Sequence, residues 1–265
     1  MIRILEIGGR RLACWVNNGS FLPDRRTLVF IHGSGGNHTD WILQYTPLKN
    51  AFNVAAIDLP GHGQSDGPGE QEVGAYATWV KKILAELGIA EPVLIGHSLG
   101  AAICLSFAIL QGSDIAAVVA LGGGIRMPVN PVILEGLRED PAAVISLAAK
   151  FSLARPNRER LSELLATTLS RVDPSILLGD FLACSRMDIR SSAAGIKVPV
   201  LALCGAEDKM TPPALAEQIV AHIPGAGLAL IPGAGHFAML ENPEEFNRVL
   251  TDFVHSLPSL PPGKG

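Results

Sequence analysis

One serine in the chain stands in a setting that suits nucleophilic catalysis. Ser98 is the middle residue of Gly96-His97-Ser98-Leu99-Gly100, between the β-rich run Pro92 to Ile95 and the apolar segment Ala101 to Leu110. A sharp turn from a strand into a buried helix would expose the serine hydroxyl, and a Cβ at either glycine would collide with the neighbouring backbone. The helix would also direct free N–H groups toward an oxyanion above Ser98. We therefore predict that Ser98 is a nucleophile; the alternative is a helix cap flanked by glycines.

The chain contains its own control for this motif. Gly63-Gln64-Ser65-Asp66-Gly67 has the same spacing, but Pro68 and Gly69 follow it and no apolar helix begins there. We interpret this second match as a turn. The context of Ser98, and not the five-residue pattern alone, is what singles it out.

A serine hydroxyl is a poor nucleophile near neutral pH, so it needs a base, and the base needs an anion to hold it. His236 follows the β-rich run Leu228 to Ile231, and Asp208 follows the run Pro199 to Leu203. Because the carboxyl ends of parallel strands meet at one sheet edge, both side chains should lie at the edge that carries Ser98. The sequence thus predicts a catalytic triad of Ser98, Asp208 and His236.

Glu207 is the alternative acid beside Asp208. The turn into Thr211-Pro212-Pro213 favours Asp208. Taken alone, Asp208 could cap the helix that follows, and His236 could be a loop or capping histidine. We prefer the joint interpretation because the residue types that it needs occur together at one predicted edge.

A glycine-rich loop follows the run Thr27 to Ile31. The loop His32-Gly33-Ser34-Gly35-Gly36-Asn37 lets backbone N–H groups approach a ligand closely. We expect the N–H groups of Ser34 and Leu99 to form an oxyanion hole, in which each donor contributes roughly 3 to 4 kcal/mol. Phosphate binding is disfavoured, because no Lys-Ser or Lys-Thr follows the glycines.

Eight β-rich runs alternate with helix-length segments, which is typical of a mostly parallel sheet with helices on both faces. The first two runs are joined by a short glycine turn, which predicts an antiparallel edge, and later runs are joined by helices such as 71–87 and 212–223. The predicted strands are Ile2 to Ile7, Leu12 to Val16, Thr27 to Ile31, Asn53 to Ile57, Pro92 to Ile95, Ile115 to Leu121, Pro199 to Leu203 and Leu228 to Ile231.

No β-rich run is predicted between Gly124 and Ile196, where the pattern of apolar residues, interrupted by prolines, indicates several amphipathic helices. Strands on both sides are needed to complete one sheet, so we predict an insertion after the sixth strand. The expected organisation is a core of residues 1–124 and 196–257, a helical segment of residues 125–195 and a tail of residues 258–265.

Composition narrows the class of protein. The 265 residues are 48% apolar and 17% charged, which allows one compact unit with a sizeable core. A net charge of −4 indicates neither a nucleic-acid nor a cationic partner. The most apolar stretch, Leu94 to Leu110, is too short and too interrupted for a membrane span, and the N-terminus MIRILEIGGRR lacks signal-peptide features. We expect a cytoplasmic protein.

Four cysteines, Cys14, Cys104, Cys184 and Cys204, are far apart in the sequence. This spacing predicts reduced, mostly buried thiols and no metal or redox site.

In combination, the motifs resemble those of α/β-hydrolase fold enzymes, from about Thr27 to Phe253. The stretches that carry the resemblance are 32–36, 58–66, 96–100, 205–208 and 235–236. The resemblance implies an α/β-hydrolase fold in which residues 125–195 form a cap that roofs the pocket and selects the substrate. It also implies that 58–66 is a structural turn, so we leave His62, Ser65 and Asp66 outside the catalytic set.

The resemblance implies a serine hydrolase without cofactor or metal, most simply a carboxylesterase for small to medium acyl esters. Family members that are dehalogenases or epoxide hydrolases have Asp at the position of Ser98, which argues against those reactions. One alternative is an enol-lactonase or a carbon–carbon bond hydrolase for ring-fission acids. Another, of a different class, is a ligand receptor with slow or absent turnover. The oligomeric state is not indicated.

Cap residues offer two further candidates. Arg126 directly follows Gly122-Gly123-Gly124 at the base of the cap and is our candidate clamp for a substrate carboxylate. Solvated helix faces are the alternative interpretation for this and the other cap arginines. A set spaced as a buried helical stripe could pack in the core or line the pocket roof: Phe151, Leu153, Phe181, Leu182 and Met187.

Overall fold

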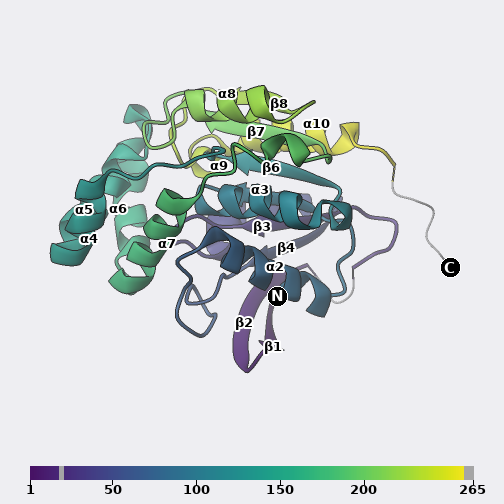
Figure 1. Cartoon of the computed structure of the whole chain (residues 1–265), viewed down its shortest axis with the longest axis horizontal. Helices are drawn as coiled ribbons and strands as arrows, with labels where there is room; N and C mark the ends of the chain where they lie inside the picture. Colours follow the sequence, from purple (N-terminus) through teal and green to yellow (C-terminus); the bar gives the residue numbers. More distant parts are fainter. Residues whose placement is uncertain (18–20, 260–265) are drawn as a thin grey trace.

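The computed structural model describes residues 1–17 and 21–259, so residues 260–265 of the predicted tail lie outside it. Within this part, eight strands form one sheet in the order β1-β2-β4-β3-β5-β6-β7-β8 (Figure 1). The strands are β1 (Ile2–Ile7), β2 (Arg10–Val16), β3 (Thr27–Ile31), β4 (Asn53–Ile57), β5 (Val93–His97), β6 (Ala117–Leu121), β7 (Val200–Gly205) and β8 (Gly227–Ile231).

Strand directions follow the sequence prediction. β2 pairs antiparallel with both β1 and β4, and all other neighbours are parallel. Every residue of the central strands β3 to β6 is buried, as expected when helices cover both faces of a parallel sheet. The predicted α/β-hydrolase sheet with an antiparallel edge is therefore confirmed.

Helices cover both faces of the sheet. The helices are α1 (Ile42–Leu48), α2 (Val73–Glu86), α3 (Leu99–Gln111), α4 (Pro131–Glu139), α5 (Pro141–Phe151), α6 (Arg158–Leu169), α7 (Pro174–Arg186), α8 (Pro213–His222), α9 (Ala238–Glu241) and α10 (Pro243–Ser256). Short 3₁₀ turns occur at η1 (His38–Trp41), η2 (Gly112–Asp114), η3 (Arg155–Asn157) and η4 (Ala193–Gly195).

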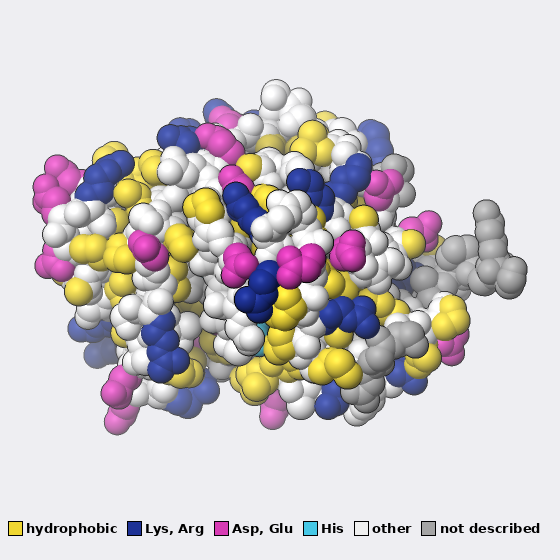
Figure 2. Space-filling view, turned by 90° about the horizontal axis from the view of Figure 1, so that it is seen from below, with side chains coloured by type: hydrophobic (Ala, Val, Ile, Leu, Met, Phe, Trp, Pro, Cys, Tyr) yellow, Lys and Arg dark blue, Asp and Glu magenta, His cyan; other side chains and the backbone are white. Residues whose placement is uncertain are grey.

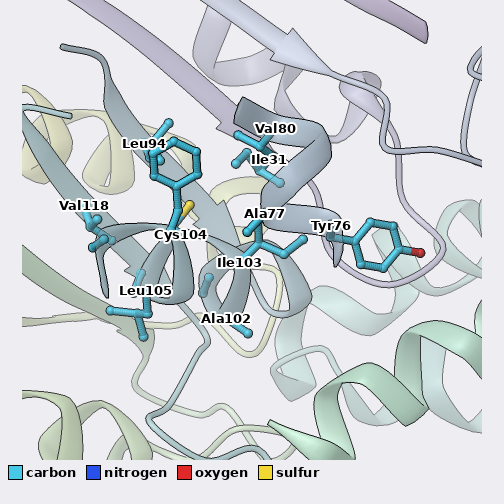
Figure 3. Close-up of a cluster of buried hydrophobic side chains, with 14 of the residues drawn as sticks. Ile31, Tyr76, Ala77, Val80, Leu94, Ala102, Ile103, Cys104, Leu105 and Val118 are labelled. Carbon is cyan, nitrogen blue, oxygen red and sulfur yellow. The ribbon is translucent and has the colours of Figure 1, made fainter. Parts of the chain in front are cut away.

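α3 is the helix on which the site depends. All residues from Leu99 to Ala108 are buried, because the helix lies between the sheet, α2 and α7. Figure 3 shows side chains of α2 and α3, among them Val80 and Ile103, packed with Ile31 and Leu94 of the sheet. The predicted buried helix after Ser98 is thus confirmed, and its close packing makes its first turn a rigid support.

Four helices, α4 to α7, lie between β6 and β7 and gather at one end of the sheet (left in Figure 1). Three of them, α4, α5 and α7, begin with a proline, and the side chain of the preceding Asn130, Asp140 or Asp173 accepts a hydrogen bond from the first turn. These local signals explain why this proline-rich segment forms helices. We call this group of helices, with their connections, the helical insertion.

The face in Figure 2 carries interspersed basic and acidic side chains and is not dominated by one sign of charge. None of the helices in residues 1–17 and 21–259 has the length and apolar content that crossing a bilayer requires.

Candidate active site

Ser98 lies at the tight junction between β5 and α3. Its backbone has a φ of +52° and a ψ of −112°, a region that costs energy for a residue with a side chain. A Cβ on Gly96 would overlap the backbone of Gly100, and a Cβ on Gly100 would overlap the carbonyl groups of Ile31 and His32. Only glycine fits at both positions, so the flanking glycines permit the strained turn that presents Ser98.

Asp208 and His236 form a buried pair. Nδ1 of His236 lies 2.8 Å from Oδ2 of Asp208, and the hydroxyl of Thr211 donates to the same oxygen at 2.8 Å. The N–H groups of Met210 and Thr211 donate to Oδ1. Burial by itself would raise the pKa of Asp208, but His236 and the hydrogen bonds outweigh burial and lower it below its ordinary value. Asp208 is therefore an anion directed at the His236 ring.

The structure brings Asp208, and not Glu207, to His236. The side chain of Glu207 is exposed, whereas Asp208 is only 4% exposed. The N–H of Asp208 donates to the carbonyl of Gly205 and closes a short turn directly after β7. That turn directs the second of the two carboxylates inward.

His97 contacts both the backbone and the ring of His236. Its Nε2 lies 2.9 Å from the carbonyl oxygen of His236, and the two ring centroids are 4.7 Å apart. Burial, together with the charge of His236, lowers the pKa of His97 well below its ordinary value. A neutral His97 with its proton on Nε2 can donate to that carbonyl. The sequence motif assigns no function to His97, and its contact with His236 arises only from the fold.

Ser34, Ser98 and His236 line one cavity of about 580 Å³. No hydrogen bond joins the Ser98 hydroxyl to His236 in the described part of the chain. Catalytic hydrogen bonds of this kind commonly form or shorten only when substrate binds. The structure thus places the serine and the Asp208–His236 pair at one cavity, with the pair already hydrogen-bonded.

Leu99 follows Ser98 directly, and Ser34 lines the same cavity as Ser98. Leu99 is the first residue of α3, so its N–H has no partner within the helix. A Cβ on Gly33 would lie 3.2 Å from Cβ of Ser98, which shows how closely the loop after β3 approaches the serine. The two residues predicted to supply the oxyanion donors therefore lie near Ser98, one on α3 and one on the loop after β3.

Arg126 does not reach the cavity, and the expectation that it points at a substrate was wrong. It forms an isolated antiparallel bridge with Asp188, so the backbone here is extended. Successive side chains of an extended segment point to opposite sides. Ile125 and Met127 are buried, Arg126 between them is exposed, and Met127 lines the cavity in its place.

The cavity wall is mainly apolar and comes mostly from the helical insertion. Of the predicted stripe, Phe151 and Phe181 line the cavity, Leu153 and Met187 are buried, and Leu182 is half-buried outside the lining. Within the described residues, Lys209 is the only lysine, arginine or carboxylate of the lining. The apolar lining residues, apart from Cys184, are Met127, Pro128, Val129, Val132, Ile133, Val144, Ile145, Leu147, Ala148, Phe151, Leu169, Leu177, Phe181, Met210, Leu215 and Phe237.

The loop after β4 lies outside the cavity lining. The hydroxyl of Ser65 donates to the carbonyl of Asp58 and accepts from the N–H of Ala13, and Asp66 accepts from the N–H of Arg11. His62 contacts Asp180 of α7. These bonds join the loop to β2 and to the insertion, which agrees with the structural role predicted for it.

The four cysteines are free and buried. Cys184 lines the cavity, and burial raises the pKa of all four thiols. Residues 1–17 and 21–259 contain no group of three or more His, Cys, Asp or Glu side chains that could hold a metal ion.

Comparison with known proteins adds the following. The model of the family described as "Alpha/beta hydrolase family" matches residues 28–249. A 2-hydroxy-6-oxononadienedioate/2-hydroxy-6-oxononatrienedioate hydrolase from Paraburkholderia phymatum is 27% identical over 278 residues, which cover 96% of this chain and 94% of that protein. The dihydrolipoyllysine-residue acetyltransferase component of an acetoin cleaving system from Cupriavidus necator is 30% identical over 239 residues. The match covers 84% of this chain but only 62% of that relative's length.

Solved structures are similar over nearly the whole chain. A thermophilic esterase superposes with a TM-score of 0.83 at 32% identity and covers 96% of this chain and 97% of its own. The enol-lactonase from Burkholderia xenovorans LB400 superposes with a TM-score of 0.86 at 22% identity over 96% of this chain and 100% of its own, which supports the fold alone.

Proposed function

Because the chain belongs to the alpha/beta hydrolase family, we propose that it is a serine carboxylesterase for small to medium acyl esters. The observation that carries the proposal is the shared cavity, at which Ser98 and Ser34 meet the hydrogen-bonded pair of Asp208 and His236. The similarity to a thermophilic esterase at 32% identity supports the same conclusion.

The proposed reaction needs no group beyond these side chains and a water molecule. Ser98 attacks the acyl carbon while Nε2 of His236 takes the hydroxyl proton, and Asp208 holds the proton on Nδ1 and stabilises the imidazolium. The N–H groups of Ser34 and Leu99 bind the oxyanion. His236 then protonates the leaving alcohol and later activates the water that hydrolyses the acyl-enzyme.

The apolar wall supports an ester with an apolar acyl chain. A ring-fission acid carries carboxylates, which proteins bind most strongly with arginine. Arg126 is exposed and lies outside the cavity lining, and Lys209, the one lysine among the described lining residues, is exposed as well. These observations favour the esterase over carbon–carbon hydrolysis, and we propose that the helical insertion acts as the cap that provides this apolar roof.

A non-catalytic receptor is the competing class of function. A receptor has no need of an ionised carboxylate held on the imidazole that lines its cavity, as Asp208 is on His236. A serine hydrolase with a histidine base uses that arrangement, so the geometry favours an enzyme.

The test is a panel of p-nitrophenyl esters of graded chain length, with lactones and ring-fission acids, applied to wild type, Ser98→Ala and His236→Ala. We expect short to medium esters to be cleaved fastest and both variants to lose at least about 10⁴-fold in kcat. Ser191→Ala, an exposed serine of the insertion, is the matched control and should keep wild-type activity. A fluorophosphonate should label wild type at Ser98; equal rates in all proteins, or labelling that survives Ser98→Ala, would reject the proposal.

A further inference from the structure

A buried carboxylate outside the catalytic set joins the helical insertion to the core. Asp180 on α7 is 0% exposed. Its Oδ2 accepts a hydrogen bond from the N–H of Gly35 at 2.9 Å and lies 2.9 Å from Nε2 of His62. Its Oδ1 accepts from the hydroxyl of Tyr76 at 2.6 Å. Four segments of chain therefore meet at one side chain: α7, the loop after β3, the loop after β4, and α2.

Tyr76 belongs to the apolar cluster between α2 and the sheet, but its hydroxyl points away from that cluster (Figure 3). Its bond to Asp180 gives this buried hydroxyl a partner. α2 thus presents a donor to the insertion.

His62 carries the charge that balances Asp180. Its Nδ1 lies 3.0 Å from the carbonyl oxygen of Pro60, and its Nε2 faces the carboxylate, so both ring nitrogens face oxygen acceptors. A neutral imidazole has only one N–H, and only the imidazolium can donate to both. Burial would lower the pKa of His62, but the charge and hydrogen bond of Asp180 outweigh burial and raise it. The pair is therefore a fully bonded, buried ion pair.

α7 contacts the glycine-rich loop after β3, residues 32–37, at two consecutive residues. Gly35 has a φ of +66°, and a Cβ there would lie 2.8 Å from Leu169 and 3.0 Å from Leu177, so the insertion packs directly on its backbone. Cys184, one turn after Asp180, lies against the side chain of Ser34, and both residues line the cavity. Asp180 holds the backbone of Gly35, and Cys184 contacts the side chain of Ser34.

We propose that Asp180 is a positioning residue for the oxyanion hole: by holding the N–H of Gly35, it fixes the direction of the neighbouring Ser34 N–H. This inference rests on the proposed function. Preorganised donors stabilise a developing oxyanion only when they are aimed at it before the reaction, and small displacements cost rate. α7 is then part of the catalytic apparatus as well as part of the roof.

The principal test is Asp180→Asn, which keeps the shape of the side chain but replaces an acceptor oxygen by an amide donor. With a p-nitrophenyl ester we expect kcat to fall about 10- to 100-fold while KM changes less than about threefold. Glu163→Gln, an exposed carboxylate on α6, is the matched control and should retain wild-type kcat. A folded Asp180→Asn protein with wild-type kcat, or with a change in KM alone, would overturn the proposal.

A transition-state analogue separates positioning from general loosening of the fold. A trifluoromethyl ketone forms a tetrahedral adduct whose oxyanion occupies the hole. We expect its inhibition constant to rise in Asp180→Asn by about the factor that kcat/KM falls, while the inhibition constant of the neutral alcohol product stays unchanged. Parallel weakening of both inhibitors would contradict positioning.

Amide hydrogen exchange gives a readout that needs no turnover. Residues 33–37 should exchange faster in Asp180→Asn than in wild type, and unchanged exchange there would overturn the inference by itself. Absence of ester hydrolysis and of Ser98 labelling in wild type would instead reject the proposed function. If Asp180→Asn does not fold, Tyr76→Phe replaces it as the test variant, because it removes one hydrogen bond to Asp180 and keeps the carboxylate. We expect kcat to fall about two- to fivefold. An unchanged kcat would contradict the proposal.

Discussion

Two of the buried histidine–aspartate pairs in this protein are alike in chemistry but differ in surroundings. Asp208 lies 2.8 Å from Nδ1 of His236, and Asp180 lies 2.9 Å from Nε2 of His62. His236 lines the cavity, with its ring held by Asp208 on the Nδ1 side. Each ring nitrogen of His62 lies within hydrogen-bond distance of an oxygen acceptor, and His62 does not line the cavity.

The comparison shows that the pair alone does not define a catalytic function. A proton acceptor needs one nitrogen that faces the substrate and can change its protonation state. At His236 the carboxylate occupies one nitrogen and leaves the other for that purpose. At His62 both nitrogens are engaged, so the ring is a fixed cation that ties the insertion to the core.

The largest expected effect follows from exchanging each carboxylate for its amide. Asp208→Asn should lower kcat about 10⁴-fold, because the amide favours the wrong tautomer of His236. That loss should exceed the loss in Asp180→Asn by a factor of at least about 100. The measurement is steady-state ester hydrolysis, with Glu207→Gln as the control on the exposed neighbouring carboxylate. If Glu207→Gln were the more damaging change, Asp208 would not be the acid of the triad.

The pH dependence of stability should distinguish the second pair. The pKa of His62 is raised in the folded state, so the pair's contribution to the free energy of unfolding is fully present below the unfolded pKa and is lost as pH rises through the folded pKa. The groups that face His62 are Asp180 from α7, Tyr76 from α2, and His32 and Asp58 from the ends of β3 and β4.

We expect urea midpoints of wild type to fall as pH rises from about 6 to 9, and we expect Asp180→Asn to lose part of this slope. The Glu163→Gln protein should keep the wild-type slope, since its exposed carboxylate does not contact His62. Identical slopes in wild type and Asp180→Asn would show that His62 is not held as a cation by Asp180.

The smallest effect on kcat/KM is expected at Arg126, which we had predicted to contact the substrate. Arg126→Gln should change kcat/KM for an apolar ester less than about twofold, because the side chain is exposed and lies outside the cavity lining. The same rate comparison with a substrate that carries a carboxylate should also show no selective loss. A selective loss for that substrate would mean that Arg126 reaches the ligand after all.

Local sequence was sufficient where one segment carries the whole signal. The predicted strands coincide with the observed ones to within about two residues at most ends, because turn residues bound each β-rich run. The position of Ser98 could also be predicted, because Gly96 and Gly100 are required by close contacts inside one strand–turn–helix unit. Asp208 and His236 followed from their positions after strands that share an edge.

The same reasoning failed where side-chain direction or distant partners decide the outcome. Arg126 was placed by its proximity along the chain, which does not say which side of an extended backbone it occupies. Asp180 gave no local signal, because a carboxylate on an amphipathic helix is ordinarily solvated. Its partners lie 104 to 145 residues away along the chain. Thr211 lies three residues after Asp208, and that spacing is a turn signal that could have marked it.

The positions of the strands along the chain, the glycine-flanked serine, and the carboxylate and imidazole that follow two strands were determined by the sequence itself. Each is encoded within a short stretch whose steric and hydrophobic requirements are local. Only the tertiary structure decided which charged groups line the cavity and which are buried in contacts between the helical insertion and the core. That outcome depends on desolvation and on hydrogen-bond partners brought together from distant segments, and no short stretch of chain contains that information.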